Sequence, residues 1–249
     1  MSEWLLGPID PSRIHEVGPH LSWHARTMVL AWGVLVPCGV LSARYFKVFP
    51  GQNWPHTLDD RRWWHMHRLA HGMAGLLMLI GLWLILSSGS RSGSTTSFVW
   101  MHHAFGWSVV LLAASQFASG WMRGTKGGPP ALKSGGSLKG DHYDMTPRRL
   151  IFEAVHKTGG LVAVALSVPA ILTGLWQANA PTWMWLALGG WWLLLAALCW
   201  ALEQRRGAFD TYQAIWGADE TLPGNTKDPV GFGVHRQAER LGLRDNRGP

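Results

Sequence analysis

The chain has 249 residues, of which 47% are hydrophobic, 17 are tryptophan and only 15% are charged. An ordinary soluble domain carries about 25% charged residues, so this composition argues against that class and favours an integral membrane protein. The formal net charge of +7 is typical of the basic loops that orient a membrane protein, and we expect no nucleic-acid partner. The two cysteines, Cys38 and Cys199, lie far apart in apolar segments, which argues against a disulfide framework.

Residues 1–21 contain three prolines and mixed charges, and they are predicted to form a short extracytoplasmic tail. Further along, four segments contain no Asp, Glu, Lys or Arg: 27–43, 69–90, 92–122 and 158–202. A membrane-spanning helix needs about 20 apolar residues, so the last segment is long enough for two crossings. The predicted fold class is therefore all-α, an integral membrane helical bundle of five transmembrane helices. They are expected at about 22–46, 63–86, 98–122, 147–176 and 183–202.

Polar segments separate the predicted helices. The link 87–97 is rich in Ser, Gly and Thr, and segment 123–146 is rich in Gly, Pro and Lys without apolar periodicity, which predicts a long polar loop. Pro37, near the middle of the first helix, is expected to kink it. Residues 203–249 are predicted to form a cytoplasmic tail, and the aromatic residues Phe209, Tyr212 and Trp216 indicate partial order at the membrane surface.

The basic residues predict the orientation in the membrane. With five crossings, the loops after the first and third helices lie on the same side as the C-terminal tail. That side collects nearly all of the 22 lysine and arginine residues and leaves only Arg13, Arg26 and Arg91 for the other. Because basic loops favour the cytoplasmic side, we expect the N-terminus outside and the C-terminus in the cytoplasm, in a bacterial inner membrane.

Histidines near the start of four helices are the candidate functional residues. Ionisable groups inside a membrane are costly, so each suggests a functional site. Since consecutive helices run in opposite directions, His24 and His102 are predicted at the outer level, and His67 and His156 at the inner level. Two imidazoles from facing helices can hold one haem iron, which predicts two haems in a four-helix haem-binding core with the fifth helix peripheral. Two axial imidazoles leave the iron no open position, which favours electron transfer over oxygen activation.

Neighbouring residues refine this prediction. Gly106 and Gly160 each follow a candidate ligand by four positions and are expected to clear space for a flat macrocycle. His71 lies one turn from His67 on the same face and is the alternative inner ligand, whereas His103 points about 100° away from its neighbour and is expected to lie beside the ligands. The chain has no Cys-x-x-Cys-His motif, so both haems would be b haems without a covalent link. The remaining histidines are expected to be solvated: His15, His20, His56, His65, His142 and His235.

Several of these segments resemble the cytochrome b561 family of transmembrane electron carriers, especially the five-helix module that follows DOMON domains. Segments 24–26, 31–37 and 43–45 (His-Ala-Arg, Ala-Trp-Gly-Val-Leu-Val-Pro and Ala-Arg-Tyr) resemble its first helix. Segment 63–67 (Trp-Trp-His-Met-His) is similar to its second-helix opening and matches the family spacing at His67 rather than His71. His102 with Gly106 and His156 with Gly160 match the third and fourth helices. The resemblance covers about residues 22–202 and implies two b haems that move electrons across the membrane, here with no DOMON domain before the first helix.

The resemblance also implies where a donor binds. In eukaryotic relatives the cytoplasmic donor is ascorbate, which basic residues hold; Arg44 resembles an arginine of that site, while Arg68 and Lys157 flank the inner ligands. We expect these cations to attract an anionic reductant. A quinol is the alternative donor, and the acceptor and the direction of flow stay open. Membrane lipid, a homodimer and a partner redox protein are the other partners considered.

The leading interpretation is thus an oxidoreductase of the cytochrome b561 type, which passes electrons between a reductant on one face and an acceptor on the other. Two other functions stay open. One is a haem-bearing membrane anchor and electron-transfer subunit for a partner oxidoreductase. The other is a histidine-lined metal permease, which would need ligands along a pore rather than at two levels.

Overall fold

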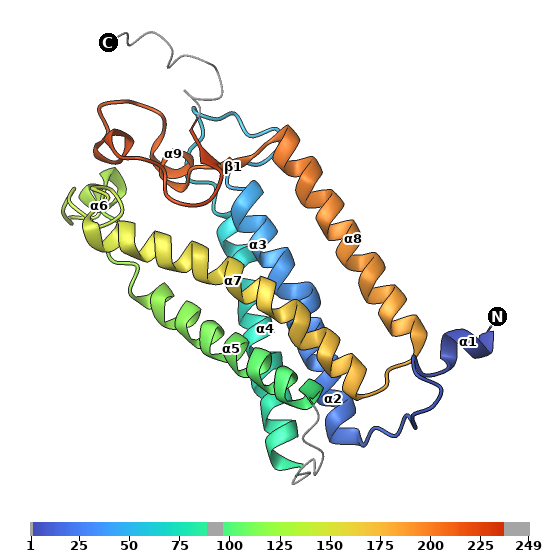
Figure 1. Ribbon diagram of the computed structural model, residues 1–249. Coiled ribbons are helices and arrows are strands. Elements are labelled where there is room, and N and C mark those ends of the chain that lie inside the picture. Colours follow the sequence, from blue (N-terminus) through green and yellow to red (C-terminus); the bar gives the residue numbers. More distant parts are fainter. Residues whose placement is uncertain (1, 89–96, 237–249) are drawn as a thin grey trace. The chain divides into compact units, whose positions relative to one another are not determined.

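Five long helices make up most of the described chain (Figure 1). The computed structural model describes residues 2–88 and 97–236. Most of the predicted link 87–97, Arg91 and the end of the predicted tail lie outside these residues. The elements are α1 (Ser2–Leu6), α2 (Pro19–Met28), η1 (Val29–Leu35), α3 (Val36–Tyr45), α4 (Arg62–Ser87), α5 (Ser97–Trp121), α6 (Pro129–Lys133), α7 (Pro147–Gln177), α8 (Thr182–Arg205), β1 (Ala208–Phe209), α9 (Thr211–Trp216), η2 (Pro223–Thr226) and β2 (Val234–His235).

The five long helices are of membrane-spanning length. α2, η1 and α3 form one continuous helix over Pro19–Tyr45, and this helix, α4, α5, α7 and α8 are each long and apolar enough to cross a membrane. The predicted all-α fold with five such helices is therefore confirmed. The first of them begins at Pro19 rather than at residue 22, because proline is well suited to the first turn, where its missing N–H leaves no bond unmade.

The first long helix changes its hydrogen bonding ahead of Pro37. Proline has no N–H to donate to the carbonyl four residues earlier, here that of Gly33. The segment Val29–Leu35 is π-helical, and the indole Nε1 of Trp191 on α8 donates to the Gly33 carbonyl at 2.8 Å. The distortion expected at Pro37 thus takes the form of a π-helical segment whose freed carbonyl is satisfied by another helix.

By their contacts, the residues fall into two compact units, each of which takes parts of the long helices. The first unit comprises Met1–Val40, His67–Ala113 and Leu161–Trp200. Its apolar core includes the fully buried Ala31 and Ala163, small residues that let membrane helices approach closely. Large side chains such as Leu193, which is 74% exposed, point outward, as expected for helices that face lipid.

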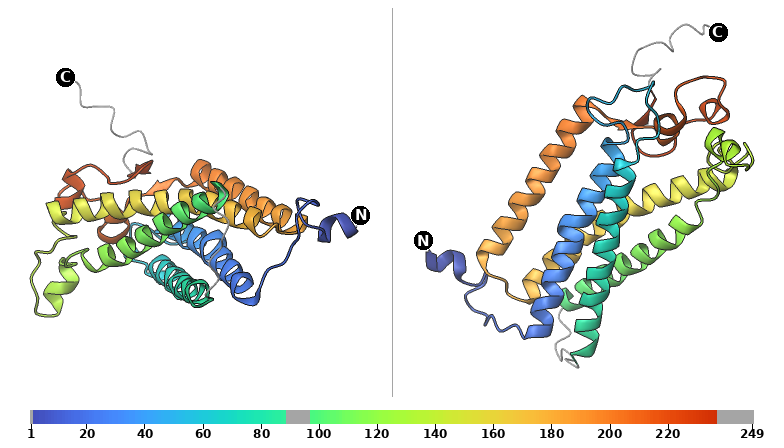
Figure 2. Two further views of the ribbon diagram at one scale, coloured as in Figure 1. Left: turned by 60° about the horizontal axis from the view of Figure 1, so that its bottom comes forward. Right: turned by 180° about the vertical axis from the view of Figure 1, so that it is seen from behind.

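The N-terminal segment of the first unit is tied to the turn between α7 and α8. Asn179 in that turn is fully buried, and its side-chain Nδ2 donates to the carbonyls of Asp10 at 3.0 Å and Arg13 at 2.8 Å. The backbone N–H of Thr182 also donates to the carbonyl of Gly7. These bonds place α1 beside the start of α8 (Figures 1 and 2).

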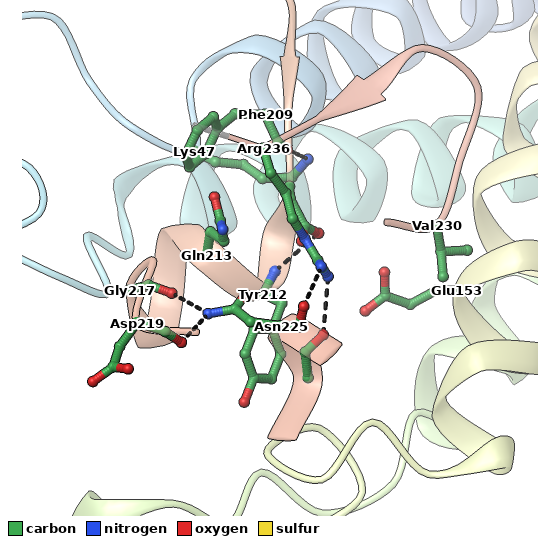
Figure 3. Close-up of polar contacts among 12 residues, drawn as sticks. Lys47, Glu153, Phe209, Tyr212, Gln213, Gly217, Asp219, Asn225, Val230 and Arg236 are labelled. Carbon is green, nitrogen blue, oxygen red and sulfur yellow. Dashed lines mark hydrogen bonds and ion pairs between the residues drawn. The ribbon is translucent and has the colours of Figure 1, made fainter. Parts of the chain in front are cut away.

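The second unit comprises Leu41–Met66, Ala114–Gly160 and Ala201–Pro249. Its described residues 206–236 form a small folded cap, in which β1 pairs in parallel with β2. Nε of Arg236 donates to Oδ2 of Asp210 at 2.7 Å, and both side chains are only 3% exposed. Arg236 also donates to two carbonyls of η2 (Figure 3). The buried charges are thus paired and hydrogen-bonded, as burial requires.

The expectation that His142 is solvated is wrong. His142 is 4% exposed, and its ring centre lies 5.9 Å from those of Tyr212 and Trp216 in the cap. Burial, and secondarily the nearby charge of Arg149, lower the pKa of His142 to about 3, so the ring is neutral at physiological pH. His235 is likewise not solvated, since its Nε2 is buried. His142 thus packs between two aromatic side chains, and His235 packs against one, Phe209.

Candidate functional site

The two predicted outer histidines lie close together in the first unit. His24 is the sixth residue of α2, and His102 is the sixth residue of α5. Their ring centres are 6.3 Å apart and their planes differ by 82°. Bonds between a metal and an imidazole nitrogen are about 2 Å long, so two imidazoles on opposite sides of one metal have ring centres roughly 6 Å apart. The observed spacing fits one metal ion between the two rings.

The hydrogen bonds of these rings indicate which nitrogen is protonated. Nδ1 of His24 lies 2.9 Å from the carbonyl oxygen of Gly81, and Nδ1 of His102 lies 2.9 Å from that of Ala170. A carbonyl oxygen only accepts, so in both rings Nδ1 carries the hydrogen. Nε2 then keeps the lone pair that a metal needs, and the backbone acceptor fixes the orientation of the ring.

Glycines shape the space around His102. A methyl group added to Gly106 on the same helix would meet no atom within 4 Å, so there is open space at that position. A methyl group added to Gly174 on α7 would lie 3.0 Å from Cε1 of His102. Gly174 therefore lets α7 approach the ring closely. Because Gly106 has no side chain, α5 leaves room there for a planar group beside His102.

His67 and His71 on α4 lie close together in the first unit. Their ring centres are 4.3 Å apart, too close for the two rings to bind one metal from opposite sides. Nδ1 of His67 lies 3.1 Å from the carbonyl oxygen of Gly39 on α3, whereas Nδ1 of His71 lies 2.8 Å from the carbonyl of His67 itself. A methyl group on Gly39 would collide with the ring of His71. The His67 ring is thus oriented by a neighbouring helix, and the His71 ring by its own.

His156 belongs to the second unit. Its Nδ1 lies 2.9 Å from the hydroxyl of Ser119 on α5, and that hydroxyl donates to the carbonyl of Gln116 at 3.0 Å. The hydroxyl therefore accepts from Nδ1–H of His156. A methyl group on Gly160 would lie 3.5 Å from Oε1 of Gln116, so a side chain borders this glycine, unlike Gly106.

The histidine beside the outer pair, His103, is exposed. Among the described residues, there is no group of three or more His, Cys, Asp or Glu side chains that could hold a metal ion together. Two facing imidazoles with open space beside them suit a metal whose other ligands come from a macrocycle, as in haem.

Two of the three predicted donor-site cations lie in the second unit. Nη1 of Arg44 donates to the carbonyl of Phe232 at 2.9 Å, and Nη2 to Oε2 of Glu203 at 3.1 Å. Nζ of Lys157 donates to the carbonyl of Val230 at 2.7 Å and also to the carboxylate of Glu153. The third cation, Arg68, is exposed and belongs to the first unit. The cap therefore covers Arg44 and Lys157 in this structure.

A nearby lysine adds to this cationic region. Lys47 is 5% exposed, and its Nζ donates to the carbonyl of Phe209 at 2.8 Å (Figure 3). Burial, and secondarily the charge of Lys157, lower the pKa of Lys47 to about 7. Glu153, which is 3% exposed, pairs with both Arg149 and Lys157. Positive charge is therefore crowded in this region and only partly compensated.

Comparison with known proteins gives one relative that bears on this site. The chain is 32% identical over 160 residues to the cytochrome b561, DM13 and DOMON domain-containing protein of Arabidopsis thaliana. The similarity supports a cytochrome b561-like relationship. The matched region is 64% of this chain but spans only 15% of the length of the plant protein. No family model and no solved structure matches the chain.

Several residues of the site carry no signal in the sequence. The acceptors of the histidine N–H groups are backbone carbonyls of Gly39, Gly81 and Ala170, and any residue type presents such a carbonyl. Gln116 and Ser119 lie about four to five helical turns beyond His102, and only the packing of α7 against α5 brings Ser119 to His156. A small residue on a facing helix is the one clue that sequence offers for Gly39 and Gly81.

Proposed function

We propose that the chain transfers electrons across a bacterial inner membrane through two b haems, with its N-terminus outside and its C-terminus in the cytoplasm. The haems are held by His24 with His102 near the outer face and by His67 with His156 near the inner face. The donor is a cytoplasmic small molecule or a quinol of the membrane, and the acceptor lies on the opposite side. The similarity to a cytochrome b561 protein supports this type of function.

The observation that carries the proposal is the outer histidine pair. Ring centres 6.3 Å apart, Nδ1 atoms engaged by carbonyls and open space at Gly106 match what two axial ligands of one haem need. A haem held by His24 and His102 would supply one-electron transfer. The carbonyls of Gly81 and Ala170 keep each Nε2 unprotonated and aimed, so the chain itself maintains the ligand geometry.

The inner pair rests on the alternation of helix direction. A single crossing, α5, lies between α4 and α7, so these two helices run in the same direction and start on the same side. Each carries a histidine in its first three turns. Nδ1 of His67 donates to the Gly39 carbonyl, and Nδ1 of His156 donates to the Ser119 hydroxyl, so both histidines have the same tautomer as the outer pair. The two haems would lie one near each end of the long helices, which span most of a bilayer.

The test is an absorbance spectrum of the purified protein, oxidised and dithionite-reduced, with haem quantified against protein. We expect the spectrum of two low-spin b haems per chain, because four oriented imidazoles provide two complete axial pairs. A preparation without haem would remove the function proposed here and favour the metal permease. One haem per chain would mean that either the proposed inner site or the proposed outer site binds no haem. The histidine variants then identify which of the two sites it is.

Gly39 offers a test of the inner site that leaves every proposed ligand in place. In the Gly39→Ala variant we expect a changed spectrum and potential of the inner haem, because the added methyl group collides with His71 and displaces the carbonyl that orients His67. Loss of such an orienting partner costs about 10- to 100-fold in metal affinity. The measurement is a redox titration of membranes that contain the variant.

Gly72→Ala is the matched control for this variant. Gly72 lies on α4 next to His71, and a methyl group there would meet no atom within 4 Å. We expect both haem components of Gly72→Ala to titrate as in the unaltered protein. Equal behaviour of Gly39→Ala and Gly72→Ala would show that the Gly39 contact has no part in holding the inner site.

A further inference from the structure

Residues 230–233 (Val-Gly-Phe-Gly), here called the strap, lie directly on the two cations predicted to bind a reductant. The Val230 carbonyl accepts from Nζ of Lys157 at 2.7 Å, and the Phe232 carbonyl accepts from Nη1 of Arg44 at 2.9 Å. Figure 3 shows Val230 beside Glu153, the carboxylate that also binds Lys157. Two carbonyl oxygens of one short segment thus occupy hydrogen-bonding positions of two cations.

Glycine permits this close approach. Gly231 has a φ of +117° and Gly233 a φ of +63°, which L side chains rarely adopt. A methyl group on Gly231 would lie 3.0 Å from Cδ of Lys157, and one on Gly233 would lie 3.2 Å from Nη2 of Arg44. Both glycines are therefore needed for the strap to reach the cations.

The strap is fixed firmly at its C-terminal end but held weakly in its middle. Directly after it, Val234 and His235 pair with β1, and the buried ion pair of Arg236 with Asp210 holds the next residue (Figure 3). In contrast, the side chain of Phe232 in the middle of the strap is 82% exposed. It therefore buries little apolar surface against the rest of the protein and contributes little to holding the strap in place. The segment can lift from the cations while the cap stays folded.

The chemistry beneath the strap favours an anion. Carbonyl oxygens are neutral, and hydrogen bonds from Arg or Lys to an anionic oxygen are roughly twice as strong as neutral ones. Arg149 and Lys157 share one carboxylate, that of Glu153, and Arg44 pairs with Glu203, so these three cations outnumber their carboxylate partners. An anion with two oxygen atoms could therefore replace the strap carbonyls and gain charge compensation that the strap does not provide.

We infer that the strap is a displaceable cover over Arg44 and Lys157, which an anionic reductant must lift in order to bind; this rests on electron entry at the cytoplasmic face as proposed above. The cover lowers the rate at which anionic reductants reach the inner site. It leaves neutral reductants, which gain nothing from the two cations, unaffected.

The test compares reduction of the haem-loaded full chain by ascorbate and by a neutral hydroquinone at low ionic strength. Each ascorbate monoanion loses one electron and one proton, and one ferric iron becomes ferrous. In a Gly231→Ala, Gly233→Ala double variant, we expect ascorbate to react about tenfold faster, because the uncovered cations concentrate the anion. The rate with the neutral hydroquinone stays unchanged. Equal ascorbate rates in the double variant and the unaltered protein would overturn the inference.

Gly135→Ala is the control, since Gly135 also has a positive φ of +78° but a methyl group there would meet no atom within 4 Å. Its ascorbate rate should equal that of the unaltered protein. A faster rate in this control would assign the effect to general loosening of the second unit and overturn the inference.

A second measurement needs neither a variant nor haem. Amide hydrogen exchange of Val234, whose N–H donates to the Gly231 carbonyl of the strap, is compared for the unaltered chain in inorganic phosphate and in chloride at equal ionic strength. We expect faster exchange in phosphate, because the anion displaces the strap carbonyls. Identical exchange in the two salts would overturn the inference even if the chain carries two haems. If the chain binds no haem but exchange is faster in phosphate, the strap is still a displaceable cover, and the missing haem rejects the proposed electron transfer.

Discussion

His24→Ala and His102→Ala are each expected to abolish the same haem component, and the double variant is expected to lose no more than either single one. The two rings lie 6.3 Å apart, and loss of one axial ligand already breaks the six-coordinate site. The remaining component should keep its potential. Redox titration of membranes that contain each variant, followed by the reduced absorbance band, measures which component disappears.

His103→Ala is the matched control on the same helix. His103 is adjacent to His102 but exposed, so both haem components should remain in this variant, with at most a shifted potential. The assignment of the outer pair fails if His24→Ala and His102→Ala remove different haem components. It also fails if the outer component is lost in His103→Ala but survives in His102→Ala.

The second large effect is expected at α4, where His67→Ala should abolish the inner haem component and His71→Ala should not. The two rings are only 4.3 Å apart, so at most one of them can bind a metal opposite a histidine from another helix. Nδ1 of His67 is oriented by Gly39 on α3, as an axial ligand needs. In His71→Ala, haem affinity should fall by no more than about 10- to 100-fold, the usual cost of losing a neighbouring group.

His156→Ala completes this experiment, because it should remove the same component as His67→Ala. A variant that combines His67→Ala with His102→Ala should retain neither haem and show no transfer from ascorbate outside vesicles to an acceptor within. Loss of the inner component in His71→Ala together with its survival in His67→Ala would reverse the assignment and make His71 the ligand.

The long helices could be predicted because their cause is local in sequence. Long apolar segments without charge are poorly solvated as loops, and they are long enough to satisfy their backbone polar groups as helices within a membrane. The charge-free segments end at Met122 and Leu202, within three residues of the observed helix ends at Trp121 and Arg205, whereas the first helix begins at Pro19, three residues before the predicted start. The sequence also places the candidate histidines near the start of their helices, where His24, His67 and His102 are each the sixth residue and His156 is the tenth.

The C-terminal cap could not be predicted in the same way. Segment 203–236 has no long apolar period, and its order comes from pairing between distant residues, such as Lys47 with Phe209 and Asp210 with Arg236. Such bonds form only after the chain has brought their partners together. The burial of His142 has the same origin, because Tyr212 and Trp216, which enclose its ring, lie about 70 residues further along the chain.

By itself, the sequence determined the number and extent of the apolar helices and which of them carry histidine near their start, because helix length and residue spacing are properties of consecutive residues. Tertiary structure alone decided which atoms orient those histidines: the carbonyls of Gly39, Gly81 and Ala170, and the hydroxyl of Ser119. It also decided that Arg44 and Lys157 are covered by the strap rather than open to solvent. Backbone carbonyls are common to all residues, so only the approach of one segment to another selects the few that accept these hydrogen bonds.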